Sequence, residues 1–208
     1  MSYVRDPAEI YRQSFATIRA EANLGHLPEA LHEVAIRMIH ACGMVDLALD
    51  ITGNDALPQA VRAALLAGAP VFCDCEMVRS GIIRRSLPET TELVMTLNDP
   101  RVPGLAQQLG TTRSAAAVEL WRERLRGAVV VIGNAPTALF HLLEIIAASG
   151  PVPAAVIATP VGFVGAAESK ALLAGGGFSM PFVTVRGRRG GSAIASAAFN
   201  AIGRGLEA

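Results

Sequence analysis

The sequence has little charge for its length. Of its 208 residues, 17% are charged and 51% are hydrophobic, and the mean hydropathy is +0.40. So little charge leaves apolar surface that another subunit would most simply cover. The 18 Lys and Arg residues balance 18 Asp and Glu residues, and they form no basic tail or stripe. We therefore expect an oligomer, and we do not expect nucleic acid as a partner.

Patterns that bind metal or form disulfides are also missing. The three cysteines, Cys42, Cys73 and Cys75, are odd in number and form no CxxC pair, so neither a disulfide framework nor a zinc site follows from them. The four histidines lack the HExxH spacing of zinc enzymes. The sequence therefore predicts no metal site.

No targeting or membrane-spanning segment is evident. The first residues, MSYVRDPAEIYRQ, contain no apolar signal core. The most apolar stretch, residues 128–148, is broken by GNAP and contains a histidine and a glutamate. A strand, a loop and a helix explain this stretch better than a membrane span. We expect a cytoplasmic protein.

Several familiar enzyme motifs are absent. The sequence contains no GxxxxGK[ST] phosphate loop, no GxGxxG dinucleotide fingerprint and no GxSxG nucleophile elbow. Hydrolase chemistry therefore has no support. A phosphate- or nucleotide-binding α/β enzyme is a weaker alternative, because it would need one of the Gly-rich loops to bind phosphate without these motifs.

Short apolar runs alternate with helical segments along most of the chain. The expected strands are residues 71–73, 93–97, 128–132, 155–158 and 182–185. The expected helices are residues 7–23, 28–43, 58–67, 112–125, 136–149, 166–173 and 192–202. This alternation is typical of a parallel sheet that is buried on both faces. The sequence thus predicts one α/β domain over residues 1–208, a three-layer sandwich with a mostly parallel sheet, and leaves the strand order open.

Three loops follow the expected strands at the edge where such sheets bind ligands, the carboxyl ends of the strands. They are GNAPT (133–137), TPVGFVGA (159–166) and RGRRGGS (186–192). Each is rich in Gly or Pro and precedes a helix, whose first amide groups favour an anion.

His40, in the segment RMIHACGMVD, is the best candidate for chemistry. It lies almost opposite the core stripe of its helix at about 100° per residue, and its neighbours there are Ile36, Met44 and Glu33. The stripe consists of Leu31, Val34, Ala35, Met38, Ile39 and Cys42. A mixed apolar and ionisable surface indicates a pocket wall or a subunit contact. His40 is therefore either a general acid or base, or a structural helix or dimer-contact histidine.

Two other side chains have alternative interpretations. Ser14 interrupts an apolar stripe of Ile10, Ser14 and Ile18, so its hydroxyl either bonds back to its own helix or faces a pocket. His141, between Phe140 and Leu142, is expected to pack in the core.

Arginines mark possible anion sites. Arg113 is expected in the first turn of a helix that begins at Thr111 or Thr112, where the helix dipole disfavours a cation unless an anion is bound. A solvated surface arginine is the alternative. The arginines of RGRRGGS either meet carboxylates or lie in a solvated loop.

The sequence resembles the precorrin-8X methylmutase (precorrin isomerase) family of cobalamin biosynthesis over nearly its whole length. The segments that carry the resemblance are DPAEIYRQSF, RMIHACGM, DCEMVRSGI, TTRSAAA, GNAPTALF, TPVGFVGAAESK and PFVTVRGRRGGS. Members of this family are α/β homodimers with a parallel sheet. They move a methyl group from C-11 to C-12 on ring C of precorrin-8X and give hydrogenobyrinic acid, which is expected to stay tightly bound.

The resemblance also implies roles for individual residues. The family's catalytic histidine corresponds to His40, which would protonate the macrocycle and ease a 1,5-sigmatropic shift. The serine and arginine near the family's active site correspond to Ser14 and Arg113. No metal or organic cofactor is expected. Thr112, Arg79, Asn134 and Arg186 complete the expected substrate-binding set, in which arginines would meet the carboxylates at the rim of the macrocycle.

Two alternatives to this function stay open. One is a carrier that binds the corrinoid product without chemistry. The other is the related methylmutase that acts on cobalt-precorrin-8, although HACGM and DCEMVRSGI look more like the metal-free branch.

Overall fold

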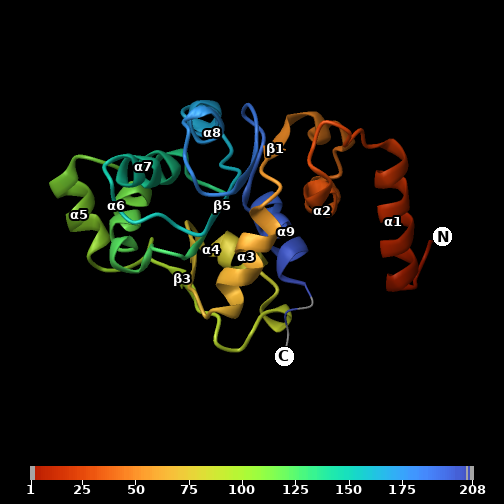
Figure 1. The fold of residues 1–208 in the computed structure, drawn as a ribbon, viewed down its shortest axis with the longest axis horizontal. Helices are drawn as coiled ribbons and strands as arrows, with labels where there is room; N and C mark the ends of the chain where they lie inside the picture. The colour runs from red at the N-terminus through yellow and green to blue at the C-terminus, as the bar shows by residue number, and fades with distance from the viewer. Residues whose placement is uncertain (1–2, 205, 207–208) are drawn as a thin grey trace.

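The computed structural model describes residues 3–204 and 206. A six-stranded sheet with the order β1-β6-β5-β4-β2-β3 forms its centre (Figure 1). The strands are β1 (Ile51–Gly53), β2 (Val71–Cys73), β3 (Leu93–Met95), β4 (Val129–Ile132), β5 (Ala155–Ala158) and β6 (Phe182–Val185). All neighbours are parallel except β1, which pairs with β6 in the antiparallel direction at one edge.

Helices cover both faces of this sheet. They are α1 (Pro7–Glu21), α2 (His32–Cys42), α3 (Leu57–Leu66), α4 (Glu76–Gly81), α5 (Val102–Leu109), α6 (Arg113–Glu119), α7 (Pro136–Ala147), α8 (Ala166–Gly175) and α9 (Ser192–Gly203). Val129 and Val131 of β4 pack with α2, α3 and α9, whereas Val130 and Ile132 pack with α7 and Trp121. Because successive strand residues face opposite sides, both faces are buried, which confirms the predicted three-layer arrangement.

All five predicted strands and seven predicted helices are present, with ends shifted by a few residues. The structure adds β1, α4 and α5, which the sequence analysis missed. The predicted helix 112–125 is shorter than expected, because α6 ends at Glu119 and a 3₁₀ turn, Arg122–Arg124, follows it.

Helix ends follow local chemistry. Asp6 caps α1, and its Oδ1 accepts the N–H of Ala8 at 3.0 Å. Gly43 ends α2 in the left-handed conformation with φ of 69°, which favours glycine. These two residues therefore fix the ends of the helices that carry Ser14 and His40.

The strand order reverses between β2 and β4, since the chain extends from β2 to β3 on one side and from β4 to β5 and β6 on the other. Asp74, directly after β2 at this point of the sheet, is buried. Its carboxylate accepts the N–H groups of Gly133 at 3.0 Å, Asn134 at 2.9 Å and Ala135 at 2.8 Å. Burial raises the pKa of Asp74, while these three N–H bonds oppose the increase. The carboxylate thus holds the GNAPT loop in place.

We expect Asp74→Asn to lower the free energy of unfolding by about 2–4 kcal/mol, because Oδ2 accepts two N–H groups and a buried donor left unpaired costs about 1–3 kcal/mol. An amide has only one acceptor oxygen and would turn N–H donors toward N–H donors. Urea unfolding followed by circular dichroism measures the change. The exposed Asp55→Asn is the matched control, and equal midpoints for the two variants would contradict this role.

Candidate active site

Helix α2 is buried on two opposite sides. Val34, Ala35, Met38 and Ile39 lie in the core below it, and Ile36, on the side away from that core stripe, is buried as well. Helix α1 packs along this second side. His40 is half-buried there, so the sequence-based prediction of a histidine on a covered second face is confirmed.

The His40 ring is held by three side chains of α1. The Oγ of Ser14 lies 2.8 Å from Nδ1 of His40. The ring of Tyr11 stacks on the imidazole with centroids 5.5 Å apart and an interplanar angle of 28°, and the ring of Phe15 lies 5.0 Å away. Ser14 therefore bonds across to α2 rather than back to its own helix.

This arrangement assigns different tasks to the two ring nitrogens. When the imidazole is neutral, the Ser14 hydroxyl can donate to Nδ1, and the proton then sits on Nε2. When the ring is protonated, Nδ1–H donates to Ser14 and Nε2–H is the proton available for transfer. In both states the serine fixes the orientation of the ring, so the pair is suited to general acid–base chemistry at Nε2.

A cavity of about 310 Å³ opens beside this pair. It is lined by Ser14, Thr17, Ile18, Glu21, Ile39, His40, Gly43 and Val45. Glu21 is its one carboxylate among the described residues. The cavity gives a ligand access to the histidine from between α1 and α2.

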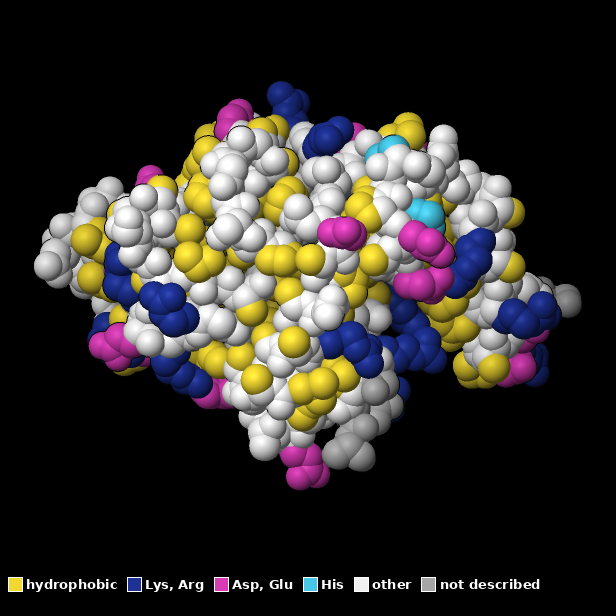
Figure 2. Space-filling model, viewed as in Figure 1, with side chains coloured by type: hydrophobic (Ala, Val, Ile, Leu, Met, Phe, Trp, Pro, Cys, Tyr) yellow, Lys and Arg dark blue, Asp and Glu magenta, His cyan; other side chains and the backbone are white. Residues whose placement is uncertain are grey.

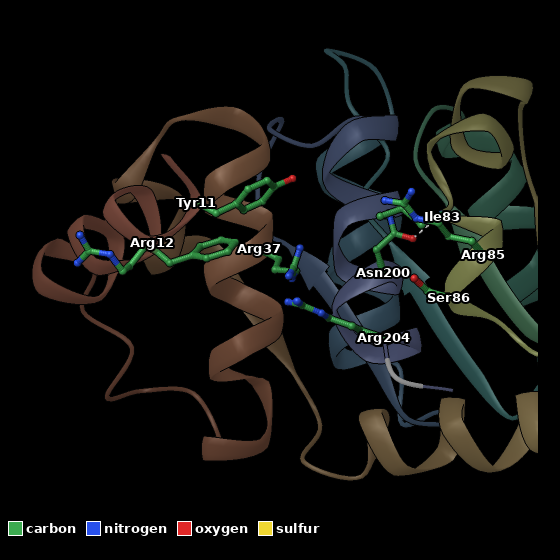
Figure 3. Close-up of a pocket in the computed structure, with 9 residues that line it drawn as sticks. Tyr11, Arg12, Arg37, Ile83, Arg85, Ser86, Asn200 and Arg204 are labelled. Carbon is green, nitrogen blue, oxygen red and sulfur yellow. Dashed lines mark hydrogen bonds between the residues drawn. The ribbon is translucent and has the colours of Figure 1, made fainter. Parts of the chain in front are cut away.

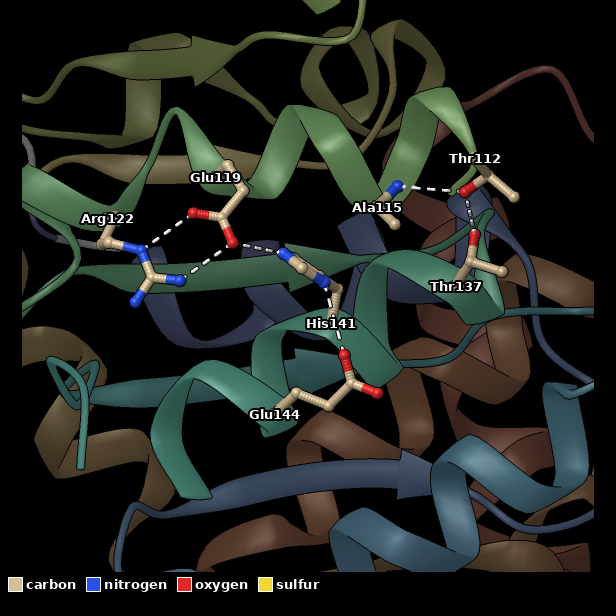
Figure 4. A network of polar contacts seen from close by, with 7 residues as sticks. All are labelled: Thr112, Ala115, Glu119, Arg122, Thr137, His141 and Glu144. Atoms are coloured by element: carbon tan, nitrogen blue, oxygen red, sulfur yellow. Dashed lines mark hydrogen bonds and ion pairs between the residues drawn. The ribbon is translucent and has the colours of Figure 1, made fainter. Parts of the chain in front are cut away.

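Arg113 and Thr112 lie at the start of α6, as predicted. Thr112 caps the helix: its Oγ1 accepts the N–H of Ala115 at 3.1 Å and donates to Oγ1 of Thr137 at 2.8 Å (Figure 4). The Nη2 of Arg113 donates to the carbonyl of Leu97 at 3.1 Å. Among residues 3–204 and 206, no carboxylate forms an ion pair with Arg113, so the cation at this helix start has no internal anion.

The other end of α6 is tied to α7 by a polar network. The Nε2 of His141 lies 2.6 Å from Oε1 of Glu119, and its Nδ1 lies 3.4 Å from Oε2 of Glu144 (Figure 4). Arg122, and then His141, lower the pKa of Glu119. The prediction that His141 packs in the core is therefore wrong, because two carboxylates hold its ring between α6 and α7.

His40 and Arg113 do not meet within one chain. Figure 1 shows α6 toward the left end of the long axis of the molecule, α2 to the right of its centre and α1 at the right end. A separation seen in projection cannot be smaller in space. His40 on α2 and Arg113 at the start of α6 therefore belong to helices that are separated along the long axis.

The remaining predicted binding residues are also dispersed. Arg79 forms an ion pair with Glu76 at 2.8 Å on α4. Asn134 is exposed on the loop that Asp74 holds. Arg186 lines a different cavity, of about 470 Å³, beside α8. The structure does not bring these side chains to His40 within one chain.

The RGRRGGS loop is anchored from two sides. Arg189 forms ion pairs with Asp46 at 2.6 Å and with Asp50. The Nζ of Lys170, a residue that is 1% exposed, donates to the carbonyl of Arg189 at 2.5 Å. Burial lowers the pKa of Lys170 to about 8. Of the two predicted alternatives for these arginines, Arg189 meets carboxylates, whereas the guanidinium of Arg188 lies 5.4 Å from the ring of Phe163.

Tyr11 and Phe15 were not predicted as neighbours of His40. The signal for them was available, because Tyr11, Ser14, Phe15 and Ile18 follow helical spacing.

Within the described ranges, no cluster of three or more His, Cys, Asp or Glu side chains could hold a metal ion. No helix of the same residues is long and apolar enough to cross a membrane.

Comparison with known proteins identifies the family. The family model described as "Precorrin-8X methylmutase" matches residues 9–204. The chain is 57% identical to the precorrin-8X methylmutase of Pseudomonas aeruginosa over 97% of both chains, and 41% identical to the cobalt-precorrin-8 methylmutase of Salmonella typhimurium over 97% of both. It also matches the solved precorrin-8x methyl mutase of Thermus thermophilus, with a TM-score of 0.83, 33% identity and 94% of each chain covered. The chain therefore belongs to the precorrin-8X methylmutase family.

Proposed function

We propose that this protein is a single-domain, cytoplasmic precorrin-8X methylmutase that moves the methyl group from C-11 to C-12 on ring C and gives hydrogenobyrinic acid, which stays tightly bound. The observation that carries this proposal is the Ser14–His40 pair, 2.8 Å apart beside a cavity between α1 and α2. The chain is 57% identical to a precorrin-8X methylmutase and 41% identical to a cobalt-precorrin-8 methylmutase. This difference supports a substrate without cobalt.

The reaction is an isomerisation, so every proton that is added must be returned. His40 would donate a proton from Nε2 to the macrocycle, which draws electron density through the conjugated system and lowers the barrier to a 1,5-shift. The carbon–carbon bond to C-11 breaks as the bond to C-12 forms. The imidazole then takes the proton back, and Ser14 keeps the ring oriented throughout.

We expect His40→Ala to lower turnover by roughly 10²- to 10⁴-fold, which is the usual contribution of a general acid or base. The fold should persist, because His40 lies off the core stripe. Ser14→Ala should lower turnover by about tenfold, since it removes one orienting hydrogen bond. Conversion of precorrin-8X, followed by its absorbance spectrum, measures both.

The exposed His26→Ala is the control for loss of a histidine. His40→Ala activity within a few-fold of the wild-type value would refute the catalytic role. If the wild-type protein bound hydrogenobyrinic acid but converted no precorrin-8X, this result would instead indicate a carrier.

The proposed active enzyme is a homodimer in which His40 of one subunit and Arg113 of the partner subunit act on the same substrate. Two observations support this arrangement. Helix α2, which carries His40, and helix α6, which begins at Arg113, are separated along the long axis of one chain (Figure 1). The N-terminal segment and α1 also expose Tyr3, Val4, Ile10 and Tyr11, an apolar surface that a second subunit would cover. In a two-fold dimer both sites would be completed in the same way.

Mixing two defective variants tests the shared site. We expect His40→Ala and Arg113→Ala each to be weakly active when assayed alone at low substrate concentration. After subunit exchange, activity should recover to about one quarter of the wild-type level, because half of the dimers are mixed and each mixed dimer contains one intact site.

A mixture of His40→Ala with His40→Gln is the matched control, since it cannot rebuild a site. Light scattering and native mass spectrometry report whether mixed dimers form. Mixed dimers without recovered activity would refute the shared site, and so would an active monomer.

A further inference from the structure

A cavity of about 410 Å³ lies on the other side of Tyr11 and Phe15 from His40. Four arginines line it, together with Tyr11, Phe15, Ile83, Ser86 and Asn200. The arginines are Arg12, Arg37, Arg85 and Arg204, and the cavity with these side chains is called the arginine cleft below. Among the residues that the structure describes, no Asp or Glu lines this cavity.

The arginines of the cleft come from segments far apart in the sequence. Arg37 is on α2, Arg85 on the 3₁₀ turn Arg84–Ser86, and Arg204 directly follows α9. Figure 3 shows the guanidinium groups of Arg37 and Arg204 facing one another across the gap. On the surface, Figure 2 shows Lys and Arg side chains gathered in the hollow between the segment that carries α1 and the body of the molecule.

The fold holds Arg85 at this position. The Oδ1 of Asn200 accepts the N–H of Ile83 at 2.9 Å, and its Nδ2 donates to the carbonyl of Gly81 at 2.8 Å, so α9 fixes the start of the turn. The neighbouring Arg84 donates to the carbonyls of Pro88 and Glu89 and is held along its own turn. Arg85, by contrast, lines the cleft.

Within residues 3–204 and 206, ion pairs do not balance the positive charge of Arg37, Arg85 and Arg204 in the cleft. Seven arginines elsewhere or at its rim form ion pairs with carboxylates: Arg12, Arg19, Arg79, Arg101, Arg122, Arg124 and Arg189. In the described part of the chain, Arg37, Arg85 and Arg204 have no such partner. Burial, and secondarily the charge of Arg204, lower the pKa of Arg37, while Tyr11 and Glu33 oppose this decrease. Cations that converge without a counter-ion are costly unless an anion binds between them.

The cleft and the histidine share a wall. Tyr11 and Phe15 contact the imidazole of His40 on one side and line the cleft on the other. The guanidinium of Arg37 lies 5.2 Å from the centroid of the Phe15 ring, which limits its movement. An anion bound by Arg37 is therefore held at a fixed position relative to His40.

We propose that the arginine cleft binds peripheral carboxylates of a corrinoid whose macrocycle lies at His40, and so sets which ring of the macrocycle faces the imidazole. This inference rests on the proposed function for the identity of the ligand. A guanidinium binds a carboxylate through two parallel N–H···O bonds, so the cleft would recognise both the negative charge and the planar geometry of the carboxylate. It would discriminate against a corrinoid in which these carboxylates are amides.

Titration of hydrogenobyrinic acid and of its fully amidated counterpart, followed by absorbance, tests this inference without turnover. We expect Arg37→Gln to weaken binding of the acid by about 10- to 100-fold, because it removes a charge-assisted pair. Arg85→Gln should also weaken binding of the acid. The Arg85 side chain is exposed, so this substitution should leave the fold intact. Binding of the amide should change much less. Arg37→Lys should recover part of the loss, since it keeps the charge without the fork of donors.

Arg126→Gln removes one exposed positive charge just before β4, at the edge of the sheet opposite the carboxyl ends, and is the matched control. Unchanged affinity of both Arg37→Gln and Arg85→Gln for the acid would overturn the inference. Equal losses of affinity for the acid and for the amide would show that the cleft does not discriminate by charge. Loss of the dimer in light scattering, with affinity per dimer unchanged, would show that the cleft seats a second subunit instead.

The result is independent of catalysis. If His40→Ala remained active, the proposed mechanism would fail, yet the charge-dependent binding at the cleft would still be measurable. If the wild-type chain bound neither corrinoid, the proposed function itself would fail.

Discussion

The need to cover α2 on both sides is the constraint on which the candidate active site depends. One side of α2 is part of the core against the sheet, and α1 covers the other with Tyr11, Ser14 and Phe15. Yet Ile18 is the only residue of α1 that is fully buried. The helix that orients His40 is thus attached by few apolar contacts, so the geometry of the site depends on polar and aromatic contacts that a second subunit or a ligand would reinforce.

Most of the fold could be predicted because parallel strands buried on both faces are continuous apolar runs. Residues 128–132 and 155–158 are of this kind, and their order along the chain alternates with helices. Strand β1 has three residues and ends in glycine, so it has no such pattern, and its pairing with β6 depends on tertiary contacts. Helix α5 begins with Val-Pro-Gly, which is typical of a turn as much as of a helix. The strand order also depends on packing between distant segments, and the sequence does not encode it locally.

The candidate site divides in the same way. Helical spacing was enough to find His40, and an unusual charge in a first turn was enough to mark Arg113, because both signals lie within one helix. The arginine cleft has no local signal, since its members meet only after α2, α9 and the turn at Arg84–Ser86 have packed together. Arg79 was a weak candidate for binding the substrate, because Glu76, three residues before it on the same helix face, pairs with its guanidinium.

The distribution of charge around α1 suits an amphipathic macrocycle. On one side of the helix, the cavity at His40 contains Ile18, Ile39 and Val45 and a single carboxylate, Glu21. On the other side, the described residues that line the arginine cleft include four arginines and no acid. A flat ligand with carboxylates at its rim would be repelled by Glu21 and attracted to the guanidinium groups, so electrostatics alone favours one orientation across Tyr11 and Phe15. A chain with no net charge can bind a polyanion in this way, because three arginines that form no ion pair within the described residues, Arg37, Arg85 and Arg204, line one cleft.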